Sequence, residues 1–252
     1  MVIRLFDDAG ELDLEGITSA IDRHYISTLI VNCPANPTGD CLSDEELRTL
    51  AALARDHDLI LIGDEVYNWM RYEDTPRTLL GFAPERTIVV GAASKEFLIP
   101  GARTSWILTT DEVFSNQWLP RLIRTTSSSP NVLGQNLTLE MVSADVQDMD
   151  ASRPPKYLSS IRKELRHRRD LMVEVVREHG FTIVGRVANQ PPPGGISLFC
   201  RLPEGLVNDV EFNNRAIELG RFSAIPGPAF GAPGHIRFGY AGMTLESIHR
   251  MR

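Results

Sequence analysis

The sequence predicts an α/β fold in which a mostly parallel sheet is followed by a smaller α+β domain. Short apolar runs alternate with helical patterns in the first half, which is typical of βαβ units. The residues are 42% hydrophobic and 23% charged, as in ordinary soluble globular proteins. At roughly 150 residues per domain, the 252 residues suffice for one large domain or two smaller ones.

The first expected elements are a strand at 29–31 and a helix that follows a loop rich in proline and glycine. Ser43 can cap the start of this helix, and Glu46 can reach back to the cap, which is the signature of a capping box. We expect the helix to end near His57. Its apolar stripe is formed by Leu47, Leu50, Ala51 and Ala54.

Two further strands are expected at 59–62 and 87–90, and each runs into polar residues. The first leads into Asp64 and the second into Lys95. Ligands of open α/β sheets bind beyond the carboxyl ends of the strands, so we expect the chemistry at these two ends. A strand at 103–109, helices near 111–123 and 132–147, and a loop at 127–130 complete the domain of residues 1–150.

The second predicted domain covers residues 151–252 and begins with a long helix after Pro154 and Pro155. Gly180 is a suitable stop for this helix. Strands are expected at 181–184, 196–200 and 235–240, with a helix at 209–219. The apolar stripe of the long helix is formed by Ile161, Leu165, Met172, Val175 and Val176.

The charge and cysteine content narrow the classes of partner. A net charge of −7 repels polyphosphates, so we expect a small-molecule partner and no nucleic acid. Three cysteines spaced by 8 and 159 residues fit neither a zinc ribbon nor a redox pair, so we expect a reduced protein without a metal site. We also expect a cytoplasmic protein with no membrane segment, because no apolar run reaches about 18 residues and the N-terminus carries early charges.

Several residues could carry chemistry, although most have an ordinary structural explanation when taken alone. Asn36 lies in an Asn-Pro-Thr-Gly turn, and Asp64 and Tyr67 could simply cap and pack. Lys95 is one of only three lysines and follows an apolar strand and a run of small residues. An amine in such surroundings loses its proton more readily, as a nucleophile must.

Two arginines are candidates for binding anions. Arg103 follows Lys95 by eight residues, and its planar guanidinium suits a phosphate. Arg237 lies in the strand at 235–240, where alternation places it beside Gly239 and opposite an apolar face formed by Ile236, Phe238 and Tyr240. It has room there to bind a carboxylate, although a solvated strand face would also explain it.

The order and spacing of these residues resemble the class I/II aminotransferases of the fold type I pyridoxal-phosphate family. Asp64-Glu-Val-Tyr67 begins 28 residues after Asn36, Lys95 follows Asp64 by 31 residues, and Arg103 and Arg237 come later in the same order. The resemblance covers essentially the whole chain. It implies a three-layer fold, pyridoxal 5′-phosphate as cofactor and a homodimeric assembly.

The resemblance also implies a role for each residue. Lys95 would form a Schiff base with the cofactor and then move the proton from the substrate Cα. Asp64 would pair with the ring nitrogen, and Tyr67 and Asn36 would hydrogen-bond the ring 3-oxygen. Phosphate would be held by Arg103 with Ser94. Arg237, with Asn36 near it, would bind the substrate α-carboxylate.

Three features depart from the family pattern. Ala92 stands where the family has a phosphate-binding hydroxyl, and Ser105 replaces a glycine. A long segment that precedes this region in family members, with a Gly-rich phosphate loop and a stacking aromatic, is not in the chain. We consider loss of that part, a gene model that starts at an internal methionine, and a naturally reduced relative. A parallel sheet that lacks some of its strands exposes an edge and apolar faces, so we expect association or poor solubility of this chain alone.

The leading hypothesis is therefore amino transfer between an α-amino acid and a 2-oxo acid. Elimination, cyclisation, decarboxylation or oxidation would use the same lysine and aspartate, and the sequence does not separate them. The alternative that is not an enzyme is a truncated, non-catalytic relative. No residue indicates which amino acid would be the substrate.

Overall fold

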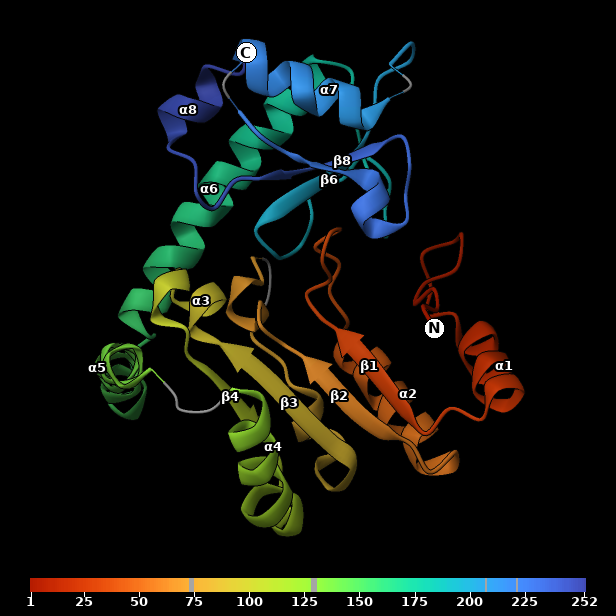
Figure 1. Ribbon diagram of the computed structural model, residues 1–252, viewed down its shortest axis with the longest axis vertical. Helices are drawn as coiled ribbons and strands as arrows, with labels where there is room; N and C mark the ends of the chain where they lie inside the picture. The colour runs from red at the N-terminus through yellow and green to blue at the C-terminus, as the bar shows by residue number, and fades with distance from the viewer. Residues whose placement is uncertain (73–74, 128–130, 207, 221) are drawn as a thin grey trace. The chain divides into compact units, whose positions relative to one another are not determined.

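The computed structural model describes residues 1–72, 75–127, 131–206, 208–220 and 222–252 (Figure 1). The chain forms two compact units. The first consists of Met1–Cys33, Leu42–Trp69 and Thr75–Ile161, and the second of Pro34–Cys41, Met70–Asp74 and Arg162–Arg252. The domain boundary expected between residues 150 and 151 stays a prediction.

The first unit contains a four-stranded sheet with the order β1-β2-β3-β4 (Figure 1). Its strands are β1 (Thr28–Asn32), β2 (Ile60–Asp64), β3 (Thr87–Ala92) and β4 (Ser105–Leu108). The pairs β1–β2 and β2–β3 are parallel, and β4 runs antiparallel to β3. The prediction of a mostly parallel sheet is thus confirmed.

The strand expected at 103–109 is shorter than predicted. Arg103 has a φ of +49° at the end of a 3₁₀ turn, Pro100–Ala102, and this left-handed conformation is incompatible with a strand. The strand β4 therefore begins two residues later, at Ser105.

The helices of the first unit are α1 (Leu14–His24), α2 (Asp44–Asp56), α3 (Ala93–Glu96), α4 (Leu119–Thr126) and α5 (Val132–Asp150). The helix expected at 111–123 is a π-helical turn, Phe114–Trp118, followed by α4. Pro120 lies in the first turn of α4, directly after this π-helical turn. Of the loop expected at 127–130, residues 128–130 lie outside the described residues.

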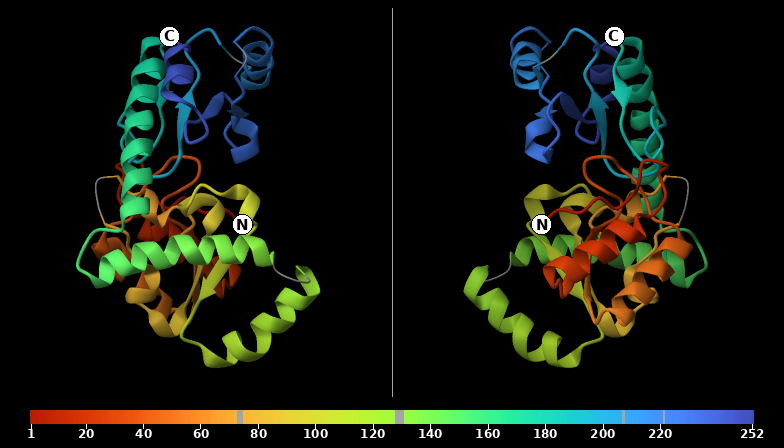
Figure 2. Two further views of the ribbon diagram at one scale, coloured as in Figure 1. Left: turned by 90° about the vertical axis from the view of Figure 1, so that its left-hand side faces the viewer. Right: turned by 90° about the vertical axis from the view of Figure 1, so that its right-hand side faces the viewer.

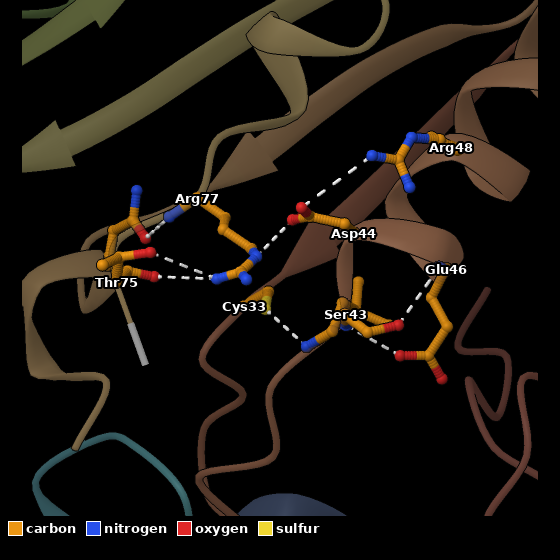
Figure 3. A network of polar contacts seen from close by, with 9 residues as sticks. Cys33, Ser43, Asp44, Glu46, Arg48, Thr75 and Arg77 are labelled. Atoms are coloured by element: carbon orange, nitrogen blue, oxygen red, sulfur yellow. Dashed lines mark hydrogen bonds and ion pairs between the residues drawn. The ribbon is translucent and has the colours of Figure 1, made fainter. Parts of the chain in front are cut away.

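The predicted capping box of α2 is confirmed (Figure 3). The Ser43 hydroxyl accepts from the Glu46 backbone N–H at 3.3 Å, and the Glu46 carboxylate accepts from the Ser43 backbone N–H at 2.8 Å. In the same network, Asp44 forms an ion pair with Arg77. Two backbone donors are thereby satisfied at the N-terminus of α2.

One face of the first sheet is covered, and the other exposes apolar side chains. Val31 and Leu61 are 3% and 0% exposed and pack in one cluster with α2. Ile30 and Ile60 occupy alternate positions on the same strands and are 66% and 40% exposed. Strands that are apolar on both faces are typical of a sheet covered on both sides.

The helices α4 and α5 form a V in the first unit (Figure 2). Near α3, Met141 and Val142 of α5 pack against the cluster that contains Phe97. Other apolar residues of the two helices are exposed, with Leu133 81% and Leu122 51% exposed. No helix in the described part of the chain is both long and apolar enough to cross a membrane.

The second unit contains an antiparallel sheet with the order β5-β6-β8-β7 (Figure 1). Its strands are β5 (Thr182–Ile183), β6 (Ser197–Arg201), β7 (Ile225–Pro226) and β8 (His235–Gly239). The helices are α6 (Lys156–Glu178), which begins before this unit, α7 (Asp209–Arg215) and α8 (Leu245–His249). The helix expected at 209–219 is α7 followed by a π-helical turn, Ala216–Gly220.

The predicted stripe of α6 forms part of the core. Leu165 and Met172 are fully buried, and Val175 and Val176 are nearly so. After the helix, Gly180 has a φ of +77°, the left-handed conformation expected of a helix stop. Short 3₁₀ turns lie at Asn68–Met70, Leu79–Gly81, Pro84–Arg86 and Gly227–Phe230.

Candidate active site

Asp64 and Lys95 lie at the carboxyl ends of two neighbouring parallel strands. Asp64 ends β2 and pairs in register with Val90 of β3. Lys95 follows β3 directly, on the short helix α3. Because the carboxyl ends of parallel strands meet at one edge of the sheet, the first unit brings both side chains to this edge, as the sequence predicted.

The Lys95 amine lies over a phenol ring. Its Nζ atom is 5.9 Å from the centroid of the Tyr67 ring, and Tyr67 is only 5% exposed. The helix α3 is held by a hydrogen bond from the Ala93 N–H to the Thr104 carbonyl, and Phe97, which follows its last residue, is buried. Lys95 is therefore a half-buried amine on a fixed backbone, next to an aromatic wall.

Partial burial makes a cationic partner favourable for the Asp64 carboxylate. Burial raises the pKa of Asp64 above its ordinary value, and a hydrogen bond from the Val66 backbone N–H lowers it in part. The same burial disfavours the charged carboxylate. A protonated ring nitrogen beside it would offset that cost.

Ser94 and Arg103 lie on either side of the same strand–helix junction. Ser94 precedes Lys95 on α3, and Arg103 precedes Thr104, whose carbonyl receives the first N–H of α3. The exposed Arg103 donates from Nη1 to the Pro100 carbonyl at 3.1 Å. A phosphate at this junction would find one hydroxyl and one guanidinium within the first unit.

In the second unit, Asn36 lies on a tight turn. The Ala35 backbone N–H donates to the Asp40 carbonyl across it at 2.8 Å, and the Asn36–Pro37 peptide bond is cis. Gly39 has a φ of +77°, and a Cβ there would lie 2.4 Å from the Gly194 carbonyl oxygen. Only glycine fits this position.

Arg237 lies on β8 with the alternation that the sequence predicted. Ile236, Phe238 and Tyr240 are buried, and Arg237 is half-buried on the other face. Its Nε donates to the Ser197 hydroxyl at 2.8 Å, and its guanidinium lies 5.9 Å from the centroid of the Phe230 ring. Within the described residues, its two terminal nitrogens make no hydrogen bond.

Comparison with known proteins identifies the family. The model of the family "Aminotransferase class I and II" matches residues 1–251. The chain belongs to this family. Enzymes of the class I and II aminotransferase family depend on pyridoxal phosphate, and the structural relatives confirm the fold predicted from the motif order.

Named relatives show how much of a family member the chain represents. The aspartate/prephenate aminotransferase of Thermus thermophilus is 33% identical over 84% of this chain and 51% of its own length. The aspartate aminotransferase of Pyrococcus horikoshii is 26% identical over 88% of this chain and 54% of its own length. The chain thus spans about half the length of these curated aminotransferases.

Solved aminotransferase structures resemble the chain along nearly its whole length. A double mutant of the Thermus thermophilus aspartate aminotransferase has a TM-score of 0.80 and 30% identity over 95% of this chain and 58% of its own. The aromatic aminotransferase of Pyrococcus horikoshii has a TM-score of 0.76 and 26% identity over 97% of this chain and 62% of its own.

Two buried residues beside the motif residues of this chain were not singled out by the sequence. Ser197 is 4% exposed and bonds Arg237 from another strand. Glu96, the neighbour of Lys95, is 7% exposed and lines a cavity of about 460 Å³ together with Glu65. The sequence gives no signal for either residue, because the contact of Ser197 with Arg237 depends on strand pairing and the burial of Glu96 depends on helix packing.

Proposed function

We propose that the protein is a pyridoxal-phosphate-dependent aminotransferase that moves an amino group between an α-amino acid and a 2-oxo acid. The observation that carries this proposal is the Lys95 amine above the Tyr67 ring, at the sheet edge where Asp64 ends the neighbouring strand. Membership of the aminotransferase class I and II family supports the same conclusion.

The residues of the first unit fit the cofactor. They offer the Lys95 amine for its aldehyde, the half-buried Asp64 carboxylate for its protonated ring nitrogen, and the Tyr67 phenol for the ring oxygen. Ser94 and Arg103 would hold the phosphate. When bound, the cofactor supplies an electron sink for the negative charge that develops at the substrate Cα.

Each residue then has a task that follows from its chemistry. Lys95 would hold the cofactor and, as a free amine, would take the proton from the substrate Cα and return it as general acid. Asp64 would keep the ring nitrogen protonated. Arg237 would bind the α-carboxylate of the substrate, because a guanidinium that is held in place binds a carboxylate as a bidentate pair. Asn36 would hydrogen-bond the ring 3-oxygen of the cofactor and assist Arg237 at the carboxylate.

Other reactions of the same fold remain the second candidate. Elimination, cyclisation, decarboxylation or oxidation would use Lys95 and Asp64 in the same way and differ in the substrate bond that is aligned. A non-catalytic relative is favoured by one observation, Ala92, which leaves the end of β3 without a phosphate-binding hydroxyl.

Cofactor attachment is the first test. We expect the purified chain with pyridoxal 5′-phosphate to develop visible absorbance, and borohydride to fix the cofactor on the Lys95 peptide. Lys95→Ala should lose this label, whereas the matched control Lys156→Ala should keep it. Labelling of Lys95→Ala equal to wild type, or none in either protein, contradicts the proposal for this chain.

The type of reaction is tested separately. With an α-amino acid, amino transfer gives stoichiometric 2-oxo acid and pyridoxamine phosphate. Release of ammonia without pyridoxamine phosphate would instead assign the chain to the elimination or oxidation chemistry of the same fold.

We further infer a cytoplasmic homodimer. In the described residues no disulfide bond joins Cys33, Cys41 and Cys200, which supports a reducing compartment. The exposed apolar residues of the first sheet and of α5 support burial against a second copy.

A further inference from the structure

We propose that Ser197 is a positioning residue that sets how Arg237 presents its guanidinium to a carboxylate. This inference rests on the carboxylate-binding role of Arg237 in the proposed function. It adds a residue that the motif order does not contain, and all its contacts lie within the second unit.

The Ser197 hydroxyl connects Arg237 to the turn that carries Asn36. It accepts a hydrogen bond from the Arg237 Nε at 2.8 Å and donates one to the Pro37 carbonyl at 3.5 Å. A serine hydroxyl has one proton and two lone pairs, so both bonds can form at once. The residue is 4% exposed, and water therefore competes little for these bonds.

This contact determines which edge of the guanidinium is offered to a ligand. Five N–H groups form a planar fork, and a carboxylate can meet either the Nε edge or the two terminal nitrogens. The Nε–H of Arg237 is already engaged in the hydrogen bond to Ser197. The two terminal nitrogens of Arg237 make no hydrogen bond within the described residues. A carboxylate will therefore bind end-on, through Nη1 and Nη2.

The backbone on which Ser197 lies is itself held firmly. Ser197 pairs with Gly239 in the β6–β8 ladder. Two residues before it, the buried Gly195 carbonyl accepts hydrogen bonds from the hydroxyls of Tyr72 at 2.5 Å and Tyr240 at 3.0 Å. The hydroxyl that orients Arg237 is thus on a fixed strand and not on a mobile loop.

The test compares Ser197→Ala with Ser197→Thr in the 252-residue chain, using propionate as the probe and a ¹H–¹⁵N NMR titration. A hydrogen bond contributes about 0.5–1.5 kcal/mol, so we expect Ser197→Ala to weaken propionate binding about two- to tenfold. Ser197→Thr keeps the hydroxyl and should bind within about twofold of wild type. Thr182→Ala, which removes an exposed hydroxyl from β5 of the same sheet, is the matched control and should bind as wild type.

A second readout does not depend on any ligand. The Arg237 Nε–H resonance, assigned by its loss in Arg237→Lys, should exchange slowly with solvent in wild type and Ser197→Thr, and faster in Ser197→Ala. Unchanged exchange and unchanged propionate affinity in Ser197→Ala would overturn the inference. Absence of propionate binding to wild type would also overturn it, whereas borohydride labelling of Lys95 judges the proposed amino transfer independently.

Discussion

Glu96 is a buried carboxyl that the proposed chemistry does not use. It follows Lys95 on α3, and within the described residues it makes no hydrogen bond or ion pair. Burial, and then the nearby negative charge of Glu65, raises the pKa of Glu96 to about 8. At neutral pH its side chain is therefore mostly a neutral acid.

This residue predicts a pH dependence of stability. The pKa of Glu96 in the folded chain lies above its ordinary value of 4.5. The contribution of Glu96 to the free energy of unfolding is therefore fully present below pH 4.5 and is lost as the pH rises towards 8. The slope is about 1.4 kcal/mol per pH unit across that window. We expect Glu96→Gln to be less sensitive to pH and more stable than wild type at pH 8, as measured by urea unfolding at pH 5 and pH 8.

Glu140→Gln is the control for this experiment, because Glu140 is an exposed glutamate of α5. Its free energy of unfolding should follow wild type at both pH values. If the free energy of unfolding changed equally between pH 5 and pH 8 in wild type and in Glu96→Gln, Glu96 would already be ionised in the folded chain.

At the level of elements, the turn before β6 is held by two tyrosines. The hydroxyls of Tyr72 and Tyr240 both donate to the Gly195 carbonyl and lie 3.1 Å apart. Arg169 is 4% exposed, lies over the Tyr72 ring and donates to the Pro192 carbonyl at 2.8 Å. Burial raises the pKa of both tyrosines above the ordinary value, so the hydroxyls remain protonated donors.

Because the two hydroxyls share one acceptor, their substitutions should not be additive. Tyr72→Phe or Tyr240→Phe alone leaves one donor on the carbonyl and should cost about 1 kcal/mol of unfolding free energy. The double variant leaves a buried carbonyl without either donor and should cost about 1–3 kcal/mol beyond the sum. Urea unfolding of the four proteins measures this coupling.

Tyr25→Phe is the control for this cycle, since Tyr25 is 93% exposed. It should leave the free energy of unfolding unchanged. A double variant whose cost equals the sum of the single costs would mean that the tyrosines hold the turn independently.

At the level of the whole molecule, the chain exposes apolar surface in several places on its first unit. β1 and β4 are the edge strands of the described sheet, and Ile30 of β1 is 66% exposed. On the helices, Trp118 and Leu133 are 59% and 81% exposed. Unpaired edges together with apolar side chains favour association with other chains.

We therefore expect the chain to self-associate as its concentration rises, as measured by sedimentation velocity. Ile30→Thr combined with Leu133→Gln should shift the distribution towards monomer without loss of helical or strand signal, because both side chains are exposed. Val187→Gln, at a 61% exposed site in the second unit, should associate like wild type. A wild-type chain that stays monomeric at all concentrations would contradict this prediction.

The sequence determined what depends on neighbours along the chain. The capping box of α2, the buried stripe of α6 and the alternation around Arg237 follow from the order of polar and apolar residues, because helix and strand periods are local. Asp64 and Lys95 could be placed at strand ends for the same reason. The order and spacing of the motif residues were also sufficient to predict the family.

Contacts between residues distant in sequence were decided only by the tertiary structure. Ser197 and Arg237 are 40 residues apart, and their hydrogen bond exists because β6 pairs with β8. Arg103 fell outside its predicted strand because a 3₁₀ turn places it in the left-handed region, and Glu96 became a buried acid because helix packing removed it from water. Strand register and desolvation depend on the whole fold, and no local pattern of residues encodes them.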